Sequence, residues 1–335
     1  MFFLLTALAV KLTAASTGCH IVFTDAVGGM VWGVTAEKHS QLLIAPSLDH
    51  SVYVWNASAK YARRRLDGHA DEVWRVSTLQ NRRVPMFVTA SLDGTVRVWS
   101  LPAGGEASNE TIFAGRAMVT ALASDDREFA HGDKAGHIRL WEYTPTSIAR
   151  KGSWELGDVM VQALAFAPDR SLIVATDDGM MHMLDRATLG SLHSWRANNG
   201  SVIAIAIRDD GTLVTSGYNR IGIREPWDLQ LWQLGSRELT SSSSAFGTVT
   251  ALAFDRASDR LLLAGVEGRI FVLELPGWRV VDALIGHASA VHALHVLDDG
   301  RILSGGADHS VLLWKCMDCS EYEAEANRTL GGAEL

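Results

Sequence analysis

Few residues of this chain have types and spacings that could carry chemistry. Cys316-x-x-Cys319 has the spacing of half a zinc site or of a redox pair, but no second cysteine or histidine pair accompanies it. His292 and His295 lie three residues apart in an alternating apolar run, so their side chains would leave a strand on opposite faces. No Gly-x-Ser-x-Gly, His-Glu-x-x-His or phosphate-binding glycine loop stands out. The sequence predicts no metal, no cofactor and no enzymatic activity.

The composition narrows the class of protein further. The 335 residues are 47% hydrophobic and 20% charged, which is typical of a globular protein with a substantial core. The net charge is −8, and the densest basic clusters, Arg63-Arg64-Arg65 and Arg82-Arg83, are too short to form a basic stripe. Binding to nucleic acid is therefore not expected. After residue 20, no apolar run approaches the ~18 residues of a membrane span.

A repeat runs through the chain and must be recognised before any local structure is assigned. Apolar-alternating runs end on tryptophan, or on leucine in its place, at intervals of 44, 42, 43, 48, 41 and 41 residues: Trp55, Trp99, Trp141, Leu184, Trp232, Leu273 and Trp314. An acid stands six residues before most of them: Asp49, Asp93, Asp178, Glu267 and Asp308. The third copy has Ala135 there, with Asp133 nearby, and an insertion interrupts the fifth copy.

A second ladder of residues has the same period. A valine starts the first strand of each copy: Val31, Val73, Val119, Val161, Val202, Val249 and Val291. Short β-like runs followed by turns rich in Asp and Gly lie between the two ladders, so each copy holds four strands. One such sheet cannot bury both of its faces alone, but sheets in a ring bury them against each other. The sequence predicts an all-β, seven-bladed β-propeller of four-stranded antiparallel blades.

The two ends of the repeat region are expected to close the ring together. The stretch from Cys19 to Val34 aligns with an outer strand that leads into an inner one, whereas the last copy ends at Cys316 without an outer strand. The strand from His20 to Thr24 should therefore complete the last blade and remove an exposed edge. Antiparallel pairing would bring Cys19 close to Cys316, and a disulfide between them is a hypothesis.

Two copies carry a fuller signature, because Gly68-His69 precedes Val73 and Gly286-His287 precedes Val291. On these motifs, residues 19–316 resemble a WD-repeat β-propeller. The resemblance implies a hydrogen-bonded relay inside each of the two blades, made by His69, Thr89, Asp93 and Trp99 and by His287, Ser304, Asp308 and Trp314. We interpret these residues as structural, because they recur with the period of the fold. The Trp-Asp dipeptide itself is missing at every strand end.

Two features indicate where a partner would bind. The insertion in the fifth copy, residues 217–228, carries aromatic and arginine side chains of the kind that anchor interfaces: Tyr218, Arg220, Arg224 and Trp227. The alternative is that this loop folds back onto its own blade. Trp32 and Trp74 follow the valine ladder in neighbouring blades and are expected near the mouth of the central channel. The alternative is that they fill the mouth as core.

The segments outside the repeat leave the compartment open. Residues 1–18 are apolar, and a signal peptide, a remnant of a blade or an ordinary apolar N-terminus would each fit. Residues 317–335 form an acidic tail that we expect to be disordered. Asn-x-Ser/Thr sites at Asn56, Asn109, Asn199 and Asn327 favour the secretory pathway, whereas the resemblance favours the cytoplasm or nucleus.

The function predicted from the sequence is that of a non-catalytic scaffold. Proteins or peptides would dock on its rim and channel mouth, and the propeller would be a monomer within a larger complex. One alternative is a secreted or periplasmic propeller that binds a ligand or assists an enzyme. Another is a substrate receptor of a ubiquitin ligase, although no blade carries the Trp-Asp-x-Arg that such proteins often show after the third strand.

Overall fold

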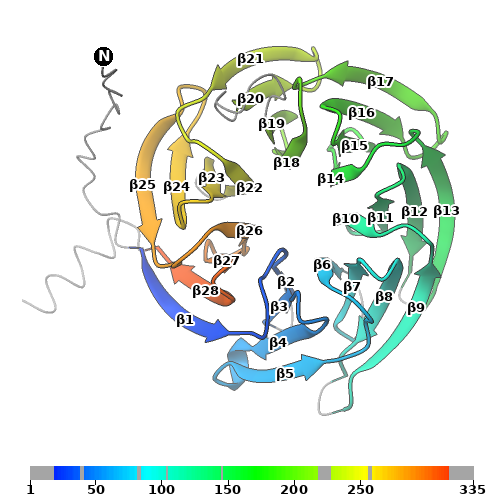
Figure 1. Ribbon diagram of the computed structural model, residues 1–335, viewed down its shortest axis with the longest axis vertical. Coiled ribbons are helices and arrows are strands. Elements are labelled where there is room, and N and C mark those ends of the chain that lie inside the picture. Colours follow the sequence, from blue (N-terminus) through cyan, green and yellow to red (C-terminus); the bar gives the residue numbers. More distant parts are fainter. Residues whose placement is uncertain are drawn as a thin grey trace, which may run out of the picture.

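The chain folds into a ring of seven four-stranded antiparallel sheets, as the sequence predicts (Figure 1). The computed structural model describes residues 19–37, 41–80, 84–102, 105–144, 146–217, 228–255 and 259–316. The predicted boundaries at residues 18 and 316 adjoin segments outside these ranges. We number the blades from 1 to 7 by their inner strands, in chain order.

Each blade has an inner, a second, a third and an outer strand. The inner strands are β2 (Thr35–Glu37), β6 (Val73–Leu79), β10 (Val119–Ser124), β14 (Val161–Phe166), β18 (Val202–Ile207), β22 (Val249–Asp255) and β26 (Val291–Val296). The second strands are β3 (Leu42–Pro46), β7 (Met86–Ser91), β11 (Glu128–Asp133), β15 (Ser171–Thr176), β19 (Thr212–Gly217), β23 (Arg260–Gly265) and β27 (Ile302–Gly306).

The third strands are β4 (Val52–Asn56), β8 (Thr95–Ser100), β12 (His137–Tyr143), β16 (Met180–Asp185), β20 (Asp228–Gln233), β24 (Arg269–Glu274) and β28 (Ser310–Lys315). The outer strands are β5 (Ala62–Leu66), β9 (Ser108–Ala114), β13 (Ile148–Glu155), β17 (Ser191–Arg196), β21 (Glu238–Ser243), β25 (Arg279–Ile285) and β1 (His20–Ala26). A single 3-10 turn, η1 (Ala57–Ala59), follows β4 within the described residues. One prediction was wrong: Val31 does not start the first inner strand, which begins at Thr35.

The apolar core lies between the blades. Among the described residues, seven clusters of buried apolar side chains each join two neighbouring blades. The second strands are buried almost throughout because a neighbouring blade covers each of their faces. The ladder residues Trp55, Trp99 and Leu184 are no more than 1% exposed. No blade can therefore bury its apolar surface without its neighbours.

Strand β1 closes the ring by pairing with β28, as predicted, and Figure 1 shows the two side by side although they lie at opposite ends of the chain. The pairing is antiparallel and sets His20 opposite Lys315. The residues just outside this pair, Cys19 and Cys316, form a disulfide with an S–S distance of 2.02 Å. The structure thus confirms the hypothesis of a disulfide between Cys19 and Cys316.

Tight turns between second and third strands define one face of the ring, which we call the upper face. The loops from each outer strand to the next inner strand reach this same face, and the remaining turns form the lower face. The turn of blade 2 requires glycine: the φ of Gly94 is +77°, and a Cβ there would lie 2.6 Å from the carbonyl oxygen of Gly115.

Candidate functional site: the upper mouth of the channel

Three aromatic rings from three neighbouring blades stack at the upper end of the inner strands. Trp32 precedes β2 in blade 1, Trp74 lies in β6 of blade 2, and His292 lies in β26 of blade 7. The ring centroids of Trp32 and Trp74 are 4.9 Å apart, and those of Trp32 and His292 are 4.6 Å apart. We call these three side chains the aromatic stack. Their close approach depends on ring closure, because blade 7 and blade 1 are at opposite ends of the repeat.

The other inner strands carry no aromatic ring at this level. The corresponding residues are Thr120, Gln162, Ile203 and Thr250. Thr120 and Thr250 turn their hydroxyls to the carbonyl oxygens of Val161 and Val291 in the next blade, each at 2.6 Å. The stack therefore occupies one side of the mouth, and side chains without aromatic rings line the rest.

A guanidinium lies directly beside the stack. Arg75 donates hydrogen bonds from Nη1 to the carbonyl oxygens of Trp32, at 2.9 Å, and of Trp74, at 3.2 Å. None of the carboxylates in the described ranges forms an ion pair with it. Burial lowers the pKa of Arg75 to about 10, so it still carries a positive charge at neutral pH. Burial, and secondarily this charge, lowers the pKa of His292, which favours the neutral imidazole.

The two indoles differ in their hydrogen bonding. Trp74 donates its Nε1–H to a carboxylate oxygen of Glu72 at 3.0 Å, which fixes its orientation. The Nε1 of Trp32 is buried and has no acceptor among the described residues. A buried indole N–H usually has a hydrogen-bond acceptor, and a buried donor without one costs about 1–3 kcal/mol of stability. Trp32 is thus poorly satisfied as a simple core residue, which weighs against the core-filling alternative.

The insertion of the fifth copy cannot be placed against this mouth. Tyr218, Arg220, Arg224 and Trp227 lie outside the described residues. The residues that flank the loop are Gly217 and Asp228, which pair with each other at the upper ends of β19 and β20. A role of the loop in partner binding remains a prediction. The loop belongs to blade 5, whereas the aromatic stack belongs to blades 7, 1 and 2.

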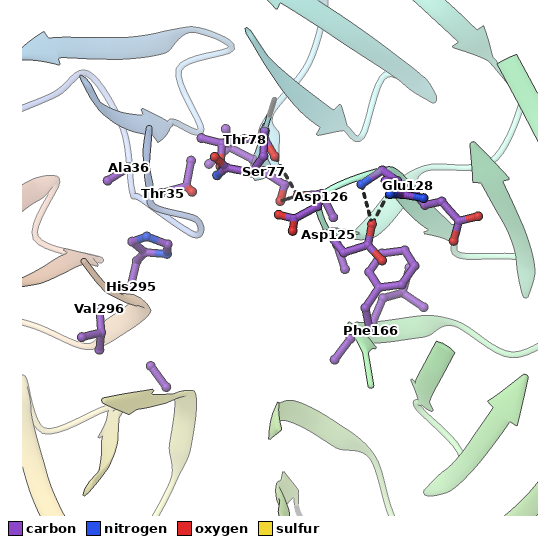
Figure 2. Close-up of a pocket in the computed structure, with 18 of the residues that line it drawn as sticks. Thr35, Ala36, Ser77, Thr78, Asp125, Asp126, Glu128, Phe166, His295 and Val296 are labelled. Atoms are coloured by element: carbon purple, nitrogen blue, oxygen red, sulfur yellow. Dashed lines mark hydrogen bonds between the residues drawn. The ribbon is translucent and has the colours of Figure 1, made fainter. Parts of the chain in front are cut away.

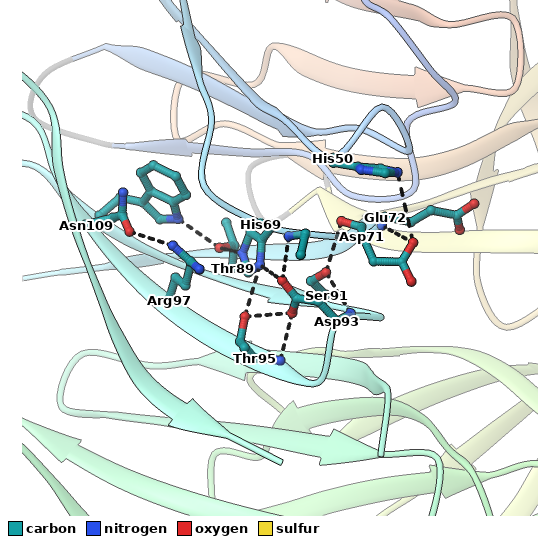
Figure 3. Close-up of polar contacts among 12 residues, drawn as sticks. His50, His69, Asp71, Glu72, Thr89, Ser91, Asp93, Thr95, Arg97 and Asn109 are labelled. Atoms are coloured by element: carbon teal, nitrogen blue, oxygen red, sulfur yellow. Dashed lines mark hydrogen bonds and ion pairs between the residues drawn. The ribbon is translucent and has the colours of Figure 1, made fainter. Parts of the chain in front are cut away.

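The side chains assigned to the relay of blade 2 lie in contact, as Figure 3 shows. His69 reaches the Oδ2 of Asp93 with Nδ1, at 2.9 Å, and the hydroxyl of Thr89 with Nε2, at 2.7 Å. Trp99 donates its indole N–H to that same hydroxyl at 2.8 Å. Burial by itself raises the pKa of Asp93, but hydrogen bonds, first from His69 and then from Thr95 and Ala70, bring it well below its ordinary value. The carboxylate is thus held ionised inside the blade.

Blade 7 repeats the arrangement. His287 contacts Asp308 at 3.0 Å and Ser304 at 2.8 Å, and Trp314 donates to Ser304 at 2.8 Å. The polar groups of these two sets bond one another inside their own blades. Their geometry suits a structural role, which stays a prediction.

The lower end of the channel has a different character, which the sequence did not reveal. A cavity of about 1660 Å³ opens there, and among its lining side chains ten are Asp or Glu while five are Lys or Arg. Figure 2 shows Asp125, Asp126 and Glu128 of blade 3 on one side and His295 on another. Arg186 bridges Asp125 and Glu128. The acidic lining residues lie on strands and turns of several blades, far apart in the sequence, so no local motif marked them.

The described residues contain neither a metal-binding cluster nor a membrane-spanning helix. No group of three or more His, Cys, Asp or Glu side chains in those ranges could hold a metal ion. No helix among the same residues is long and apolar enough to cross a bilayer. His292 and His295 are separated as expected, since the former stacks on Trp32 and the latter lines the lower cavity.

Comparison with known proteins agrees with this architecture. The family model described as "WD domain, G-beta repeat" matches residues 61–100 and 278–315, which contain most of blade 2 and of blade 7. Autophagy-related protein 16 of Arabidopsis thaliana is 22% identical over 253 residues, which cover 64% of this chain and 48% of that protein. Striatin-4 of Mus musculus is 23% identical over 236 residues, covering 65% of this chain and 30% of the relative.

A third relative is described as a WD repeat-containing protein. This protein, SL1-17 of Schistosoma mansoni, is 24% identical over 188 residues, covering 55% of this chain and 61% of its own length. The chain thus spans about half, or less, of the length of the first two relatives.

Proposed function

We propose that this chain, a WD-repeat β-propeller, is a non-catalytic scaffold that docks a peptide or loop of a partner protein on its upper channel mouth. The observation that carries the proposal is the aromatic stack of Trp32, Trp74 and His292 with the Arg75 guanidinium beside it. Aromatic and arginine side chains supply most of the binding energy at protein interfaces. Here they converge from three blades.

The charge of the site indicates the chemistry of the segment that binds. Arg75 is satisfied by carbonyl oxygens but not neutralised by a carboxylate in the described ranges. A partner segment with an Asp or Glu side chain would supply the missing charge, and its apolar neighbours would pack on the indole faces. A charge-assisted hydrogen bond is about twice as strong as a neutral one. We therefore expect the docked segment to be acidic and partly apolar.

Quantitative affinity purification with the full chain tests this proposal. Trp74→Ala and Arg75→Met should each reduce recovery of the bound protein at least tenfold, because each removes a central contact. Trp278→Ala is the matched control, since it removes a partly buried indole of blade 6 that bonds Ser241 of blade 5, away from the mouth. Equal recovery with all three variants would refute docking at the upper mouth. Circular dichroism shows whether each variant keeps the fold.

A further inference from the structure

The covalent closure of the ring has a bearing on where the protein is made. Cys19 and Cys316 are separated by 297 residues, and they meet because β1 and β28 pair in antiparallel register. The bond thus follows from the fold and joins the first and last described residues of the chain. Disulfides form and persist in oxidising compartments and are rare in the cytosol.

Asparagines in glycosylation sequons supply an independent observation. Asn109 begins the sequence Asn-Glu-Thr in the outer strand β9, and both Asn109 and Thr111 are exposed. The Oδ1 of Asn109 accepts a hydrogen bond from Arg97 at 2.9 Å. The amide nitrogen, which is the atom that carries the sugar, has no hydrogen bond to any residue that the structure describes. An oligosaccharide at this position would extend outward from the edge of blade 2.

Asn56 offers a second such site, on the neighbouring blade. It begins the sequence Asn-Ala-Ser at the turn between β4 and β5, and its Oδ1 accepts the backbone N–H of Ser58 at 2.9 Å. Ser58 is exposed, and Asn56 is half-buried. Asn56 lies on the lower side of blade 1, and Asn109 lies opposite Trp99 near the lower end of blade 2. Both positions leave the upper mouth open.

We propose that the protein matures in the secretory pathway and is N-glycosylated at Asn109 and Asn56. The donor would be an oligosaccharide linked to a lipid diphosphate. The bond between its first sugar carbon and the diphosphate oxygen breaks, a bond from that carbon to Nδ2 forms, and the amide loses one proton. The Cys19 and Cys316 thiols lose two protons and pass two electrons to the disulfide of an oxidoreductase, which is reduced to two thiols.

Expression of residues 1–335 in cultured eukaryotic cells, with no added targeting sequence, tests the proposal. Glycosidase treatment in ¹⁸O-labelled water should convert Asn109 and Asn56 to labelled Asp, which mass spectrometry of peptides detects. Thr111→Ala should abolish the label at Asn109. Thr111→Ser is the matched control and should retain it, because Ser also completes the sequon. Both substitutions keep the contact between Asn109 and Arg97.

The same samples report the state of the cysteines. Without reduction, the peptides of Cys19 and Cys316 should be recovered as one cross-linked species. Unmodified Asn109 and Asn56 in the purified chain would overturn the proposal, whatever the state of the cysteines. Free, alkylated Cys19 and Cys316 would overturn it as well. Neither result would affect docking at the upper mouth, which is measured with Trp74 and Arg75 variants.

Discussion

Blades 2 and 3 are neighbours in the ring, yet they bury their third-strand tryptophans against different partners. In blade 2, Thr89 lies opposite Arg97 and accepts the indole N–H of Trp99. In blade 3, His131 lies opposite Arg139 in the corresponding register, and the indole N–H of Trp141 has no acceptor among the described residues.

The buried histidine of blade 3 is poorly matched to its surroundings. His131 is 0% exposed, and neither of its ring nitrogens has a hydrogen-bond partner in the described part of the chain. It packs edge-on against Trp141 and Phe113 instead. The acid of this blade, Asp133, bonds His137 and Arg139 rather than a histidine from the incoming loop.

The difference teaches that packing alone suffices to form a blade. Blades 4 and 6 have apolar residues at both of the positions that Thr89 and Trp99 occupy in blade 2. These residues are Val174 and Leu184 in blade 4, and Leu263 and Leu273 in blade 6. All of these side chains are buried. We therefore expect the relay to add stability and specificity to the blades that have it, while the shape of the ring depends on apolar volume.

The largest loss of stability is expected when the acid of the blade 2 relay, Asp93, is replaced. Asp93→Ala leaves His69, Thr95 and the Ala70 amide without their acceptor, and we expect a loss of about 4 kcal/mol in the free energy of unfolding. Asp178→Ala in blade 4 should cost only about 1 kcal/mol, because the carboxylate of Asp178 accepts bonds from just Thr176 and the Met180 amide among the described residues. Urea denaturation measures both, and equal losses would contradict the comparison.

The next-largest effect is expected in how the free energy of unfolding depends on pH, through His131 of blade 3. Burial, and secondarily Arg139, lowers the pKa of His131 from 6.5 to about 3, so the unfolded chain binds a proton that the folded protein excludes. Above pH 6.5 the imidazole is neutral in both states, and His131 does not reduce the free energy of unfolding. As the pH falls from 6.5 towards 3, the unfolded chain gains a proton and the free energy of unfolding decreases. Between pH 7 and pH 4 the loss should be about 3 kcal/mol.

His131→Leu isolates this contribution, because Leu263 occupies the corresponding position of blade 6. Urea denaturation at the two pH values should show a smaller loss for the variant than for the parent protein. If the two proteins lose stability equally, His131 is not the group that excludes the proton.

A smaller difference separates two threonines. Thr89→Val removes the partner of both His69 and Trp99, and should cost about 2 kcal/mol. Thr215→Val in blade 5 removes only the acceptor of Trp232, at 3.2 Å, and should cost about 1 kcal/mol. Thermal and urea unfolding of the two variants measure these two losses of stability. A larger loss for Thr215→Val would reverse the proposed ranking of the blades.

The smallest effect is expected where the hydroxyl is kept. Ser304→Thr gives blade 7 the residue that blade 2 has, and preserves the acceptor for His287 and Trp314. The free energy of unfolding should change by less than about 0.5 kcal/mol. A loss above about 1 kcal/mol would show that the two relays tolerate different side-chain volumes.

Much of the fold could be predicted because its signals are local and periodic. The tryptophan ladder and the valine ladder recur with one period, and the turn acids mark the tight turns between them. The prediction was weakest where a blade departs from the period. Val31 precedes a strand of only three residues, and the acid of blade 3 stands at Asp133, two residues before its expected position.

The candidate site was only partly predictable. Trp32 and Trp74 were expected in neighbouring blades, but the stacking of His292 on Trp32 and the position of Arg75 could not be read from the chain. The acidic lower cavity had no signal in the sequence, because its acidic side chains come from strands and turns of different blades. The inserted loop of blade 5 lies outside the described residues, so its predicted role stays open to test.

The sequence by itself determined the number of blades, the strands within each blade and the pairing of the two chain ends, because hydrophobic alternation and turn residues act over short distances. Only the tertiary structure decided which side chains share a channel mouth and which buried polar atoms lack a partner. Those outcomes depend on closing the ring, which brings residues such as Trp32 and His292 together across most of the chain.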